Sequence, residues 1–455
     1  MCDARSRSTF RDSALLRRSF RRDVPVAVRG RGVCLWDSNE KQYLDFSGSA
    51  AVNFIGHGIS EVAAAMATQA ADLEFVHSSQ LTTQVAEVYA RELLEFAGEN
   101  FRGGRVFFTS GGSESIETAL KLSRQYQVEI GQRKRDQILG RKQSYHGSTL
   151  GALAVSGNRR RREIYVPMVR EFPHVSTPYC YRCAYNCVDC GAAYAAEVEK
   201  AIEVSRGELA AFVFEPVSGA TLGAAVPPKG YLEKVARVCR DSGVLLIADE
   251  VMTGMGRTGA DFAIKHWGIA PDILVAAKGL SSGYAPLGAV IATEQVVNAI
   301  IGGSGTFLHG FTYNAHPVSL VAGQAVLRYL KAKRLVEAAS SSNREAAGGT
   351  LEAALASLLD LNVVGDVRGL GLLWGVEFVR DRLSKTPFPA ELNFSAAISQ
   401  AAAQRGVLVY PIQGCVDGVL GDHILLAPPA IISKDEISWA VEQLRQAIAA
   451  VAVEH

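Results

Sequence analysis

Four continuously apolar runs in the middle of the chain constrain the fold more than any other feature. They occupy residues 104–110 (GRVFFTS), 210–217 (AAFVFEPV), 243–251 (GVLLIADEV) and 272–279 (DILVAAKG). Strands that are buried on both faces show such runs, whereas strands with one exposed face alternate apolar and polar residues. Between the runs, residues 115–126 and 230–240 repeat apolar side chains at helical spacing. The pattern predicts an α/β fold in which helices cover both faces of a mostly parallel sheet.

The chain as a whole has the composition of a globular protein. Its 455 residues are 48% hydrophobic and 20% charged, which argues against an intrinsically disordered chain and a small disulfide scaffold. The formal net charge is +1, so no nucleic-acid-binding surface is expected. No apolar run approaches the roughly 18 residues of a membrane span, so no membrane partner is expected either. Eight cysteines without a secretory signal indicate a reducing, cytoplasmic location.

The N-terminal segment differs from the rest of the chain in its charge. Residues 1–32 contain nine arginines and three aspartates. Transit peptides and segments that bind anionic surfaces are also rich in arginine and poor in acids. The apolar core of a secretory signal is missing, which favours an exposed arm that leads into the first strand.

The chain changes character after about residue 330. Residues 326–359 predict a long helix, residues 363–379 predict glycine-punctuated strands, and residues 433–453 predict a closing helix with a capping signal. These elements form a second, smaller α+β unit, which the strand-like residues 32–46 are expected to join. The predicted organisation is an N-terminal arm with part of the small domain (1–55), a large domain (56–330) and a C-terminal small domain (331–455).

All four predicted strands end on polar or glycine-rich residues, namely residues 110–113, Glu215, residues 249–250 and residues 278–279, which favours one shared site at the edge of the sheet. The Ser/Gly-rich turn at 110–113 precedes a helix and can hold a phosphate on its N–H groups, although a plain helix cap shows the same pattern. Asp249 follows a buried strand and can pair with a protonated ring nitrogen. Lys278 follows another buried strand. Partial burial at such a position makes the lysine amine a nucleophile, which can form a Schiff base with an aldehyde. A phosphate site, a carboxylate and such a lysine together match the requirements of pyridoxal phosphate (PLP).

Several segments of the chain closely resemble the class III aminotransferases, which have the fold type I of PLP enzymes. The resemblance extends from about residue 25 to residue 432. It rests on five motifs in the order of the family, namely FFTSGGSES, SYHGSTLGA, DEVMTGMGRTG, PDILVAAKGL and HGFTYNAHPVSLVAG. It implies a large domain with a mostly parallel mixed sheet flanked by helices, a smaller α+β domain, and PLP as the cofactor.

The resemblance also implies roles for individual residues. Lys278 would form the internal aldimine with PLP and move the proton of the substrate carbon, and Asp249 would pair with the ring nitrogen. Tyr145 and Val251 would pack on the two faces of the ring. Thr312 would reach the phosphate of the neighbouring subunit, which implies a homodimer and leaves a tetramer open. The implied catalytic residues are Lys278 and Asp249, and the implied cofactor-binding residues are Gly111, Gly112, Ser113, Tyr145, His146, Gly147, Glu215, Asp249, Val251, Lys278 and Thr312.

The activity implied by the resemblance is a transamination. An amino group would move from an ω-amino acid or amine donor to a 2-oxo acid acceptor, expected to be pyruvate, by a ping-pong mechanism. A racemase, an aminomutase or a lyase would use the same lysine on the same scaffold, and each remains an alternative. A metal-binding protein built on a cysteine cluster is an alternative from a different class.

The binding residue for the substrate carboxylate is not evident from the motifs. Members of the family often use an arginine of the C-terminal domain, but residues 406–433 contain none. Arg161 and Arg162 are the candidates for this role, although four consecutive arginines more often form a solvated surface. Arg368 matches a family position and is expected to be structural.

The cysteine cluster lies in the stretch YCYRCAYNCVDCG. Cys180, Cys183, Cys187 and Cys190 form two CxxC pairs. Structural zinc sites usually place a longer loop between the two pairs than the three residues found here. The spacing therefore favours reduced loop thiols, and no metal is expected.

Overall fold

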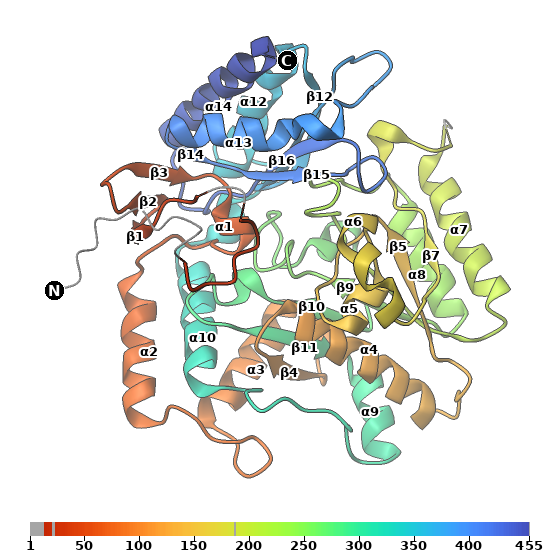
Figure 1. Ribbon diagram of the computed structural model, residues 1–455. Helices are drawn as coiled ribbons and strands as arrows, with labels where there is room; N and C mark the ends of the chain where they lie inside the picture. The colour runs from red at the N-terminus through yellow and green to blue at the C-terminus, as the bar shows by residue number, and fades with distance from the viewer. Residues whose placement is uncertain (1–12, 21–22, 186–187, 455) are drawn as a thin grey trace.

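A mostly parallel sheet lies at the centre of the molecule (Figure 1). The computed structural model describes residues 13–20, 23–185 and 188–454. Within these residues the sheet has eight strands: β4 (Arg105–Thr109), β5 (Gln137–Lys142), β6 (Ser156–Gly157), β7 (His174–Val175), β8 (Leu209–Phe214), β9 (Leu245–Asp249), β10 (Ile273–Ala276) and β11 (Gly288–Ala292). The predicted α/β class is confirmed.

The strand directions in this sheet determine where side chains meet. The order is β4-β11-β10-β9-β8-β5-β6, and β7 also pairs with β5. Strand β11 runs antiparallel to both of its neighbours, whereas the other pairings are parallel. The carboxyl ends of β4, β5, β8, β9 and β10 therefore lie at one edge of the sheet, where ligands of such sheets bind.

Both faces of the sheet are covered by helices, which explains the continuously apolar strands. On strand β9, Leu245 and Ile247 belong to one core cluster, whereas Leu246 and Ala248 belong to another. The first cluster includes side chains of α4 (Gly112–Glu129), α5 (Leu150–Val155) and α9 (Glu294–Gly302). The second includes side chains of α3 (Gln84–Ala97), α7 (Cys190–Val204), α8 (Tyr231–Asp241) and α10 (Pro317–Ala332), and α2 (Ser60–Asp72) packs against α10.

A second sheet and three helices form the C-terminal part, at the top of Figure 1. The sheet has the order β12-β13-β16-β15 and consists of β12 (Val364–Leu370), β13 (Leu373–Phe378), β15 (Tyr410–Gln413) and β16 (Asp422–Leu426). The three helices are α12 (Ala347–Ala356), α13 (Phe394–Gln404) and α14 (Lys434–Glu454). Helix α14 packs against both α12 and α13. The capping prediction is confirmed, because the Ser433 N–H donates to Glu436 Oε2 at 2.8 Å and the Glu436 N–H donates to Ser433 Oγ at 3.2 Å.

The N-terminal strands pair with a strand of the C-terminal part. Strands β1 (Ala27–Arg31), β2 (Cys34–Asp37) and β3 (Gln42–Asp45) form antiparallel pairs, and β3 then pairs in parallel with β14 (Val407–Leu408). Nearby, Lys41 Nζ donates to the carbonyl oxygen of Gln404 at 3.0 Å. The two ends of the chain are thus joined in one sheet.

The prediction of one long helix over residues 326–359 is wrong. Helix α10 ends at Ala332, a short helix α11 (Leu335–Ala338) follows, and α12 begins only at Ala347. Arg334 interrupts the helix with a left-handed φ of 52°. At the start of α12, a Cβ on Gly348 would lie 2.1 Å from the carbonyl oxygen of Ala339, so the two segments pack backbone to backbone at this glycine.

Short helices fill the connections between these elements. Two are α6 (Arg159–Arg162) and α1 (Gly48–Ala51), in which Ser49 and Ala50 have left-handed φ values of 50° and 65°. The 3₁₀ helices are Glu99–Phe101, Glu163–Met168, Cys180–Arg182, Ala263–Trp267, Lys278–Leu280, Ser357–Asp360 and Ala390–Leu392. Within the described ranges, no helix has both the length and the apolar character that crossing a bilayer requires.

Candidate active site

A cavity of about 430 Å³ opens at the edge where the parallel strands end. The segments that follow β4, β5, β8, β9 and β10 contribute to its lining, together with Asp249 at the end of β9. Of the residues that the sequence predicts for a cofactor site, the cavity brings together Gly111, Gly112, Ser113, Tyr145, His146, Gly147, Glu215, Asp249, Val251 and Lys278. Thr312 is exposed and does not line the cavity.

The turn between β4 and α4 presents backbone donors to the cavity. Gly111 precedes α4 without a side-chain cap, and no heavy atom lies within 4 Å of the position that a Cβ at this residue would occupy. The first N–H groups of a helix lack partners within the helix, and the helix dipole favours an anion beside them. The turn therefore suits a phosphate group, which needs a close approach to the backbone.

Gly147 determines how the neighbouring loop packs against this turn. Its φ of 142° lies in a region that side-chain-bearing residues rarely adopt, and a Cβ here would lie 2.5 Å from Ser113 Oγ. The following residue, Ser148, donates its N–H to Ser113 Oγ at 3.0 Å. The loop that carries Tyr145 and His146 is thus fixed directly against the first turn of α4.

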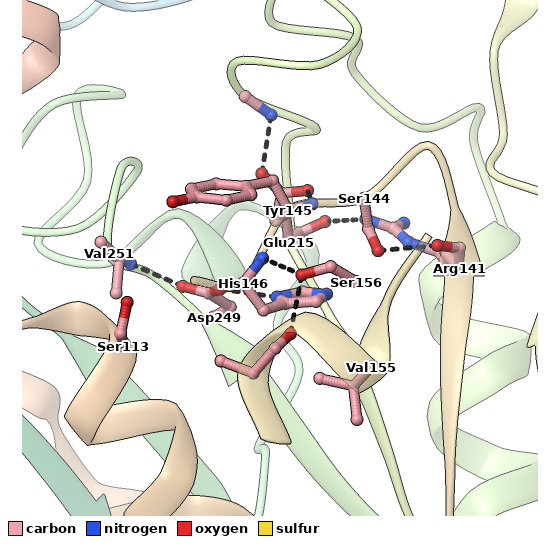
Figure 2. A network of polar contacts seen from close by, with 12 residues as sticks. Ser113, Arg141, Ser144, Tyr145, His146, Val155, Ser156, Glu215, Asp249 and Val251 are labelled. Carbon is pink, nitrogen blue, oxygen red and sulfur yellow. Dashed lines mark hydrogen bonds and ion pairs between the residues drawn. The ribbon is translucent and has the colours of Figure 1, made fainter. Parts of the chain in front are cut away.

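Asp249 is held in one orientation by a buried histidine (Figure 2). Asp249 Oδ2 lies 2.7 Å from His146 Nδ1, and Asp249 Oδ1 accepts the N–H of Val251 at 3.0 Å. His146 is in turn held in place by its backbone N–H, which donates to Ser156 Oγ at 2.8 Å. Both side chains are buried, and among the described residues His146 Nε2 has no hydrogen-bond partner. A buried carboxylate held in this way can stabilise a cation in the cavity.

Lys278 is the second residue after β10, with a left-handed φ of 45°. Burial lowers the pKa of its amine from the ordinary 10.5 to about 8, and the negative charges of Asp249 and Glu215 oppose this decrease. Desolvation disfavours a charged amine, and nearby carboxylates favour it. Near neutral pH, a far larger fraction of Lys278 is therefore a neutral, nucleophilic amine than of an exposed lysine.

Glu215 closes the cavity beside the loop of Tyr145. Its Oε2 accepts the N–H of Tyr145 at 3.3 Å, its Oε1 accepts the N–H of Gly219 at 3.0 Å, and burial raises its pKa. The carbonyl oxygen of Glu215 accepts a hydrogen bond from Arg141 Nη2 at 2.5 Å (Figure 2). The sequence motifs do not identify Arg141. Its position directly after the apolar residues 138–140 of a strand is the signal that points to it.

The two arginine candidates for the substrate carboxylate differ in their surroundings. The Arg161 guanidinium lies over the ring of Tyr145, 4.1 Å from the ring centroid. Arg162 instead donates from Nη1 to the carbonyl oxygen of Ser156 at 3.2 Å. Arg368 forms ion pairs with Asp366 and Glu377, each at 2.8 Å.

The cysteine cluster lies outside the cavity. Cys183 Sγ and Cys190 Sγ are 3.0 Å apart, and Cys180 is exposed. Cys187 lies outside the described residues. Across residues 13–20, 23–185 and 188–454, no three His, Cys, Asp or Glu side chains converge as metal ligands would.

Comparison with known proteins identifies the family. The model of the family described as aminotransferase class-III matches residues 19–448, nearly the whole chain. The chain is a class III aminotransferase. It is 37% identical over 441 residues to the uncharacterized aminotransferase YodT of Bacillus subtilis (strain 168), covering 96% of this chain and 98% of that protein. It is 34% identical to an adenosylmethionine-8-amino-7-oxononanoate aminotransferase of Geobacter sulfurreducens, covering 93% of this chain and 91% of that protein.

Solved structures of transaminases share the fold. A thermostable (S)-enantioselective omega-transaminase from Thermomicrobium roseum matches with a TM-score of 0.88 at 38% identity, over 95% of this chain and 94% of that one. An amine transaminase from an uncultivated Pseudomonas species, solved in a PLP-bound form, matches with a TM-score of 0.88 at 33% identity, over 96% of this chain and 97% of that one. The aminotransferase therefore has the fold type I, and its cofactor is PLP, on which the family depends.

The cavity of this aminotransferase fits PLP. Its volume of about 430 Å³ lies in the range of small-molecule sites. The uncapped turn at Gly111 leaves open space in front of backbone donors, which suits the phosphate. A fixed carboxylate, Asp249, and an amine of lowered pKa, Lys278, line the same space. These are the two side chains that the chemistry of PLP requires.

Proposed function

We propose that this aminotransferase moves an amino group from an ω-amino acid or amine donor to a 2-oxo acid, with pyruvate as the expected acceptor. One observation carries the proposal, namely that Lys278, Asp249 and the uncapped turn at Gly111 line a single cavity. The omega-transaminase and amine transaminase named above point to the same donor class.

In this proposal, the residues around the cavity hold PLP in a defined orientation. The N–H groups of Gly112 and Ser113 would bind its phosphate, and the Asp249 carboxylate would pair with its ring nitrogen. Tyr145 and Val251 would pack on the two faces of the ring. When bound, PLP supplies an aldehyde and a protonated ring that accepts the electron pair of a bond broken at the substrate carbon.

Lys278 is the residue that moves the proton. As a neutral amine, Lys278 Nζ takes the proton from the substrate carbon that bears the nitrogen and returns a proton to a neighbouring atom. A pKa of about 8 in place of 10.5 increases the neutral fraction at pH 7 by roughly 300-fold. The buried His146 keeps the Asp249 carboxylate aligned during both half-reactions.

The half-reaction with the donor tests the proposal. Adding an amine donor alone to the PLP-loaded protein is expected to change the absorbance of the cofactor, and adding pyruvate afterwards is expected to restore it. A racemase, an aminomutase or a lyase would release product while the spectrum returned to its starting state without an acceptor, which would refute the proposal. A panel of donors, run against pyruvate and 2-oxoglutarate separately, then identifies the two substrates.

The lysine assignment has its own test. Lys278→Ala is expected to abolish turnover, because no other group in the proposal moves the proton at the substrate carbon. The variant protein should still bind PLP, but after borohydride treatment, which reduces a PLP–lysine imine to a stable amine, it should release the cofactor on denaturation, whereas the natural protein should retain it. Normal turnover by Lys278→Ala would contradict the assignment.

We also propose that the protein forms a homodimer in which Thr312 binds the phosphate at the neighbouring copy's cavity. Thr312 is exposed and lies outside its own chain's cavity, which leaves it accessible to a second copy. Light scattering should give twice the chain mass of 48.7 kDa, or a multiple of the dimer. Thr312→Ala should weaken PLP binding by about tenfold, and a monomeric protein that binds PLP fully would refute this part.

A further inference from the structure

A second cleft adjoins the cofactor cavity at Tyr145. This cleft has a volume of about 630 Å³ and shares Tyr145 with the cavity, whereas Arg161 lines only the cleft. Tyr145 therefore stands between the two spaces. A substrate that reaches from one space into the other must pass the edge of this ring.

The cleft has a strongly positive lining. Its described lining residues include Arg18, Arg160 and Arg161, and no aspartate or glutamate is among them. The remaining polar groups are neutral donors and acceptors, such as Ser148 and Tyr410. A space of this kind, with several cations and no carboxylate, attracts an anion.

Among the described residues of its helix, Arg161 is the arginine whose guanidinium has neither a carboxylate nor a hydrogen-bond acceptor, since Arg162 donates to the carbonyl oxygen of Ser156. Arg159 pairs with Glu163 at 3.2 Å, and Arg160 Nη1 donates to Gln413 Oε1 at 2.6 Å. In the described part of the chain, no carboxylate lies within ion-pair distance of the Arg161 guanidinium, which is partly buried over Tyr145. A partly buried cation without a counter-charge is costly unless a ligand supplies one.

The position of the guanidinium suits a carboxylate. Stacking on the Tyr145 ring, 4.1 Å from its centroid, holds the planar group in place. The N–H groups at the edge of a stacked guanidinium stay available, and a carboxylate can accept two of them at once. The charge of Arg161 also lowers the pKa of Lys278, so the two groups are within electrostatic reach of each other.

We infer that Arg161 binds a carboxylate of the donor that is several carbons away from its amine, and that the protein therefore prefers ω-amino acids to simple amines. The inference rests on the proposed amino transfer and names the substrate class of that site. An α-amino acid carries its carboxylate on the reacting carbon, inside the cavity, and cannot present this group beyond Tyr145. A chain of several methylenes can place the amine beside Lys278 and the carboxylate in the cleft.

The test compares two donors that differ only in the distant group, 6-aminohexanoate and hexylamine, in the donor half-reaction of the PLP-loaded protein. In the natural protein, kcat/KM should be higher for 6-aminohexanoate, through a lower KM. Arg161→Gln should reduce the ratio of the two values by at least about tenfold, because a charge-assisted, bidentate contact is lost. Arg161→Lys should restore part of the ratio, since it keeps the charge without the planar fork.

Arg159→Gln is the matched control, because it removes the same charge from the same helix at an exposed residue outside both spaces. This variant should keep the ratio of the natural protein. A binding measurement removes the dependence on chemistry: hexanoate should bind the PLP-loaded protein in calorimetry, with at least about tenfold weaker affinity in Arg161→Gln and unchanged affinity in Arg159→Gln.

An unchanged ratio and an unchanged hexanoate affinity in Arg161→Gln would overturn the inference. An equal loss in Arg159→Gln would also overturn it, because the effect would then be that of net charge alone. Failure of the proposed function looks different: neither amine would change the absorbance of the cofactor. Hexanoate binding by calorimetry would still support or overturn the role of Arg161 in that case.

Discussion

Burial of Lys278 should make the cofactor-free protein less stable than it would be with an apolar side chain at this position. The amine has a pKa of about 8 in the folded protein, against 10.5 for an ordinary lysine. Between pH 8 and 10.5, Lys278 is therefore more often protonated in the unfolded chain than in the folded protein. The free energy of unfolding rises with pH across this window. At about 1.36 kcal/mol per pKa unit, the cost to the free energy of unfolding is about 3 kcal/mol at pH 7.

The perturbation is Lys278→Met, which keeps the length of the side chain and removes its charge. At pH 7 the variant should unfold with a free energy about 3 kcal/mol higher than that of the natural protein, both without PLP. At pH 9.5 the advantage should decrease to about 1 kcal/mol, because most of the proton has been released from the folded protein. Urea unfolding at the two pH values and one protein concentration measures both differences.

A control and a refuting result follow from the same reasoning. Lys200 is exposed on α7, so Lys200→Met should change the free energy of unfolding by less than about 0.5 kcal/mol at either pH. If Lys278→Met is no more stable than the natural protein at pH 7, or if its advantage is the same at both pH values, then burial does not perturb this lysine. The large neutral fraction that we assign to it would then be wrong.

Three further substitutions probe the packing around the site and the joining of the two parts of the chain. Gly147→Ala places a Cβ 2.5 Å from Ser113 Oγ and should weaken PLP binding at least about tenfold in an absorbance titration. Unchanged affinity would show that the loop can shift. Arg257→Met removes the donors to the carbonyl oxygens of Asn53 and Pro428 and should lower the free energy of unfolding by roughly 3 kcal/mol in urea; a neutral effect would contradict this. Ser433→Ala removes the cap of α14 and should cost about 1 kcal/mol in the same assay, and no loss would mean that the cap is dispensable.

The meeting of Lys278, Asp249 and Glu215 was predictable from the sequence. Each of these residues comes directly after a continuously apolar run, and parallel strands bring their carboxyl ends to one edge of the sheet. The contact between His146 and Asp249 was not predictable. These residues are 103 positions apart. His146 follows β5, Asp249 ends the non-adjacent strand β9, and only the packed structure determines which side chains meet.

The arginines at 159–162 show a second limit of the sequence. Four identical side chains in a row carry no periodic signal, so nothing distinguishes one from the next. In the folded chain, the turn of α6 directs Arg161 over the ring of Tyr145 and Arg162 toward the backbone of Ser156. The break between α10 and α12 escaped prediction for a related reason, since the close approach at Gly348 depends on a tertiary contact.

The pairing of β3 with β14 has a consequence for the synthesis of the protein. Lys41 and Gln404, which meet beside these strands, are 363 residues apart in the chain. At about 5–20 residues per second, a ribosome needs roughly 20 to 70 seconds to make the intervening segment. Throughout that time the free edge of β3 has no partner to cover it, which exposes the nascent chain to wrong strand pairing. Protease should therefore cut near β3 in ribosome-bound chains until the C-terminal strands emerge, and early protection of this segment would contradict the expectation.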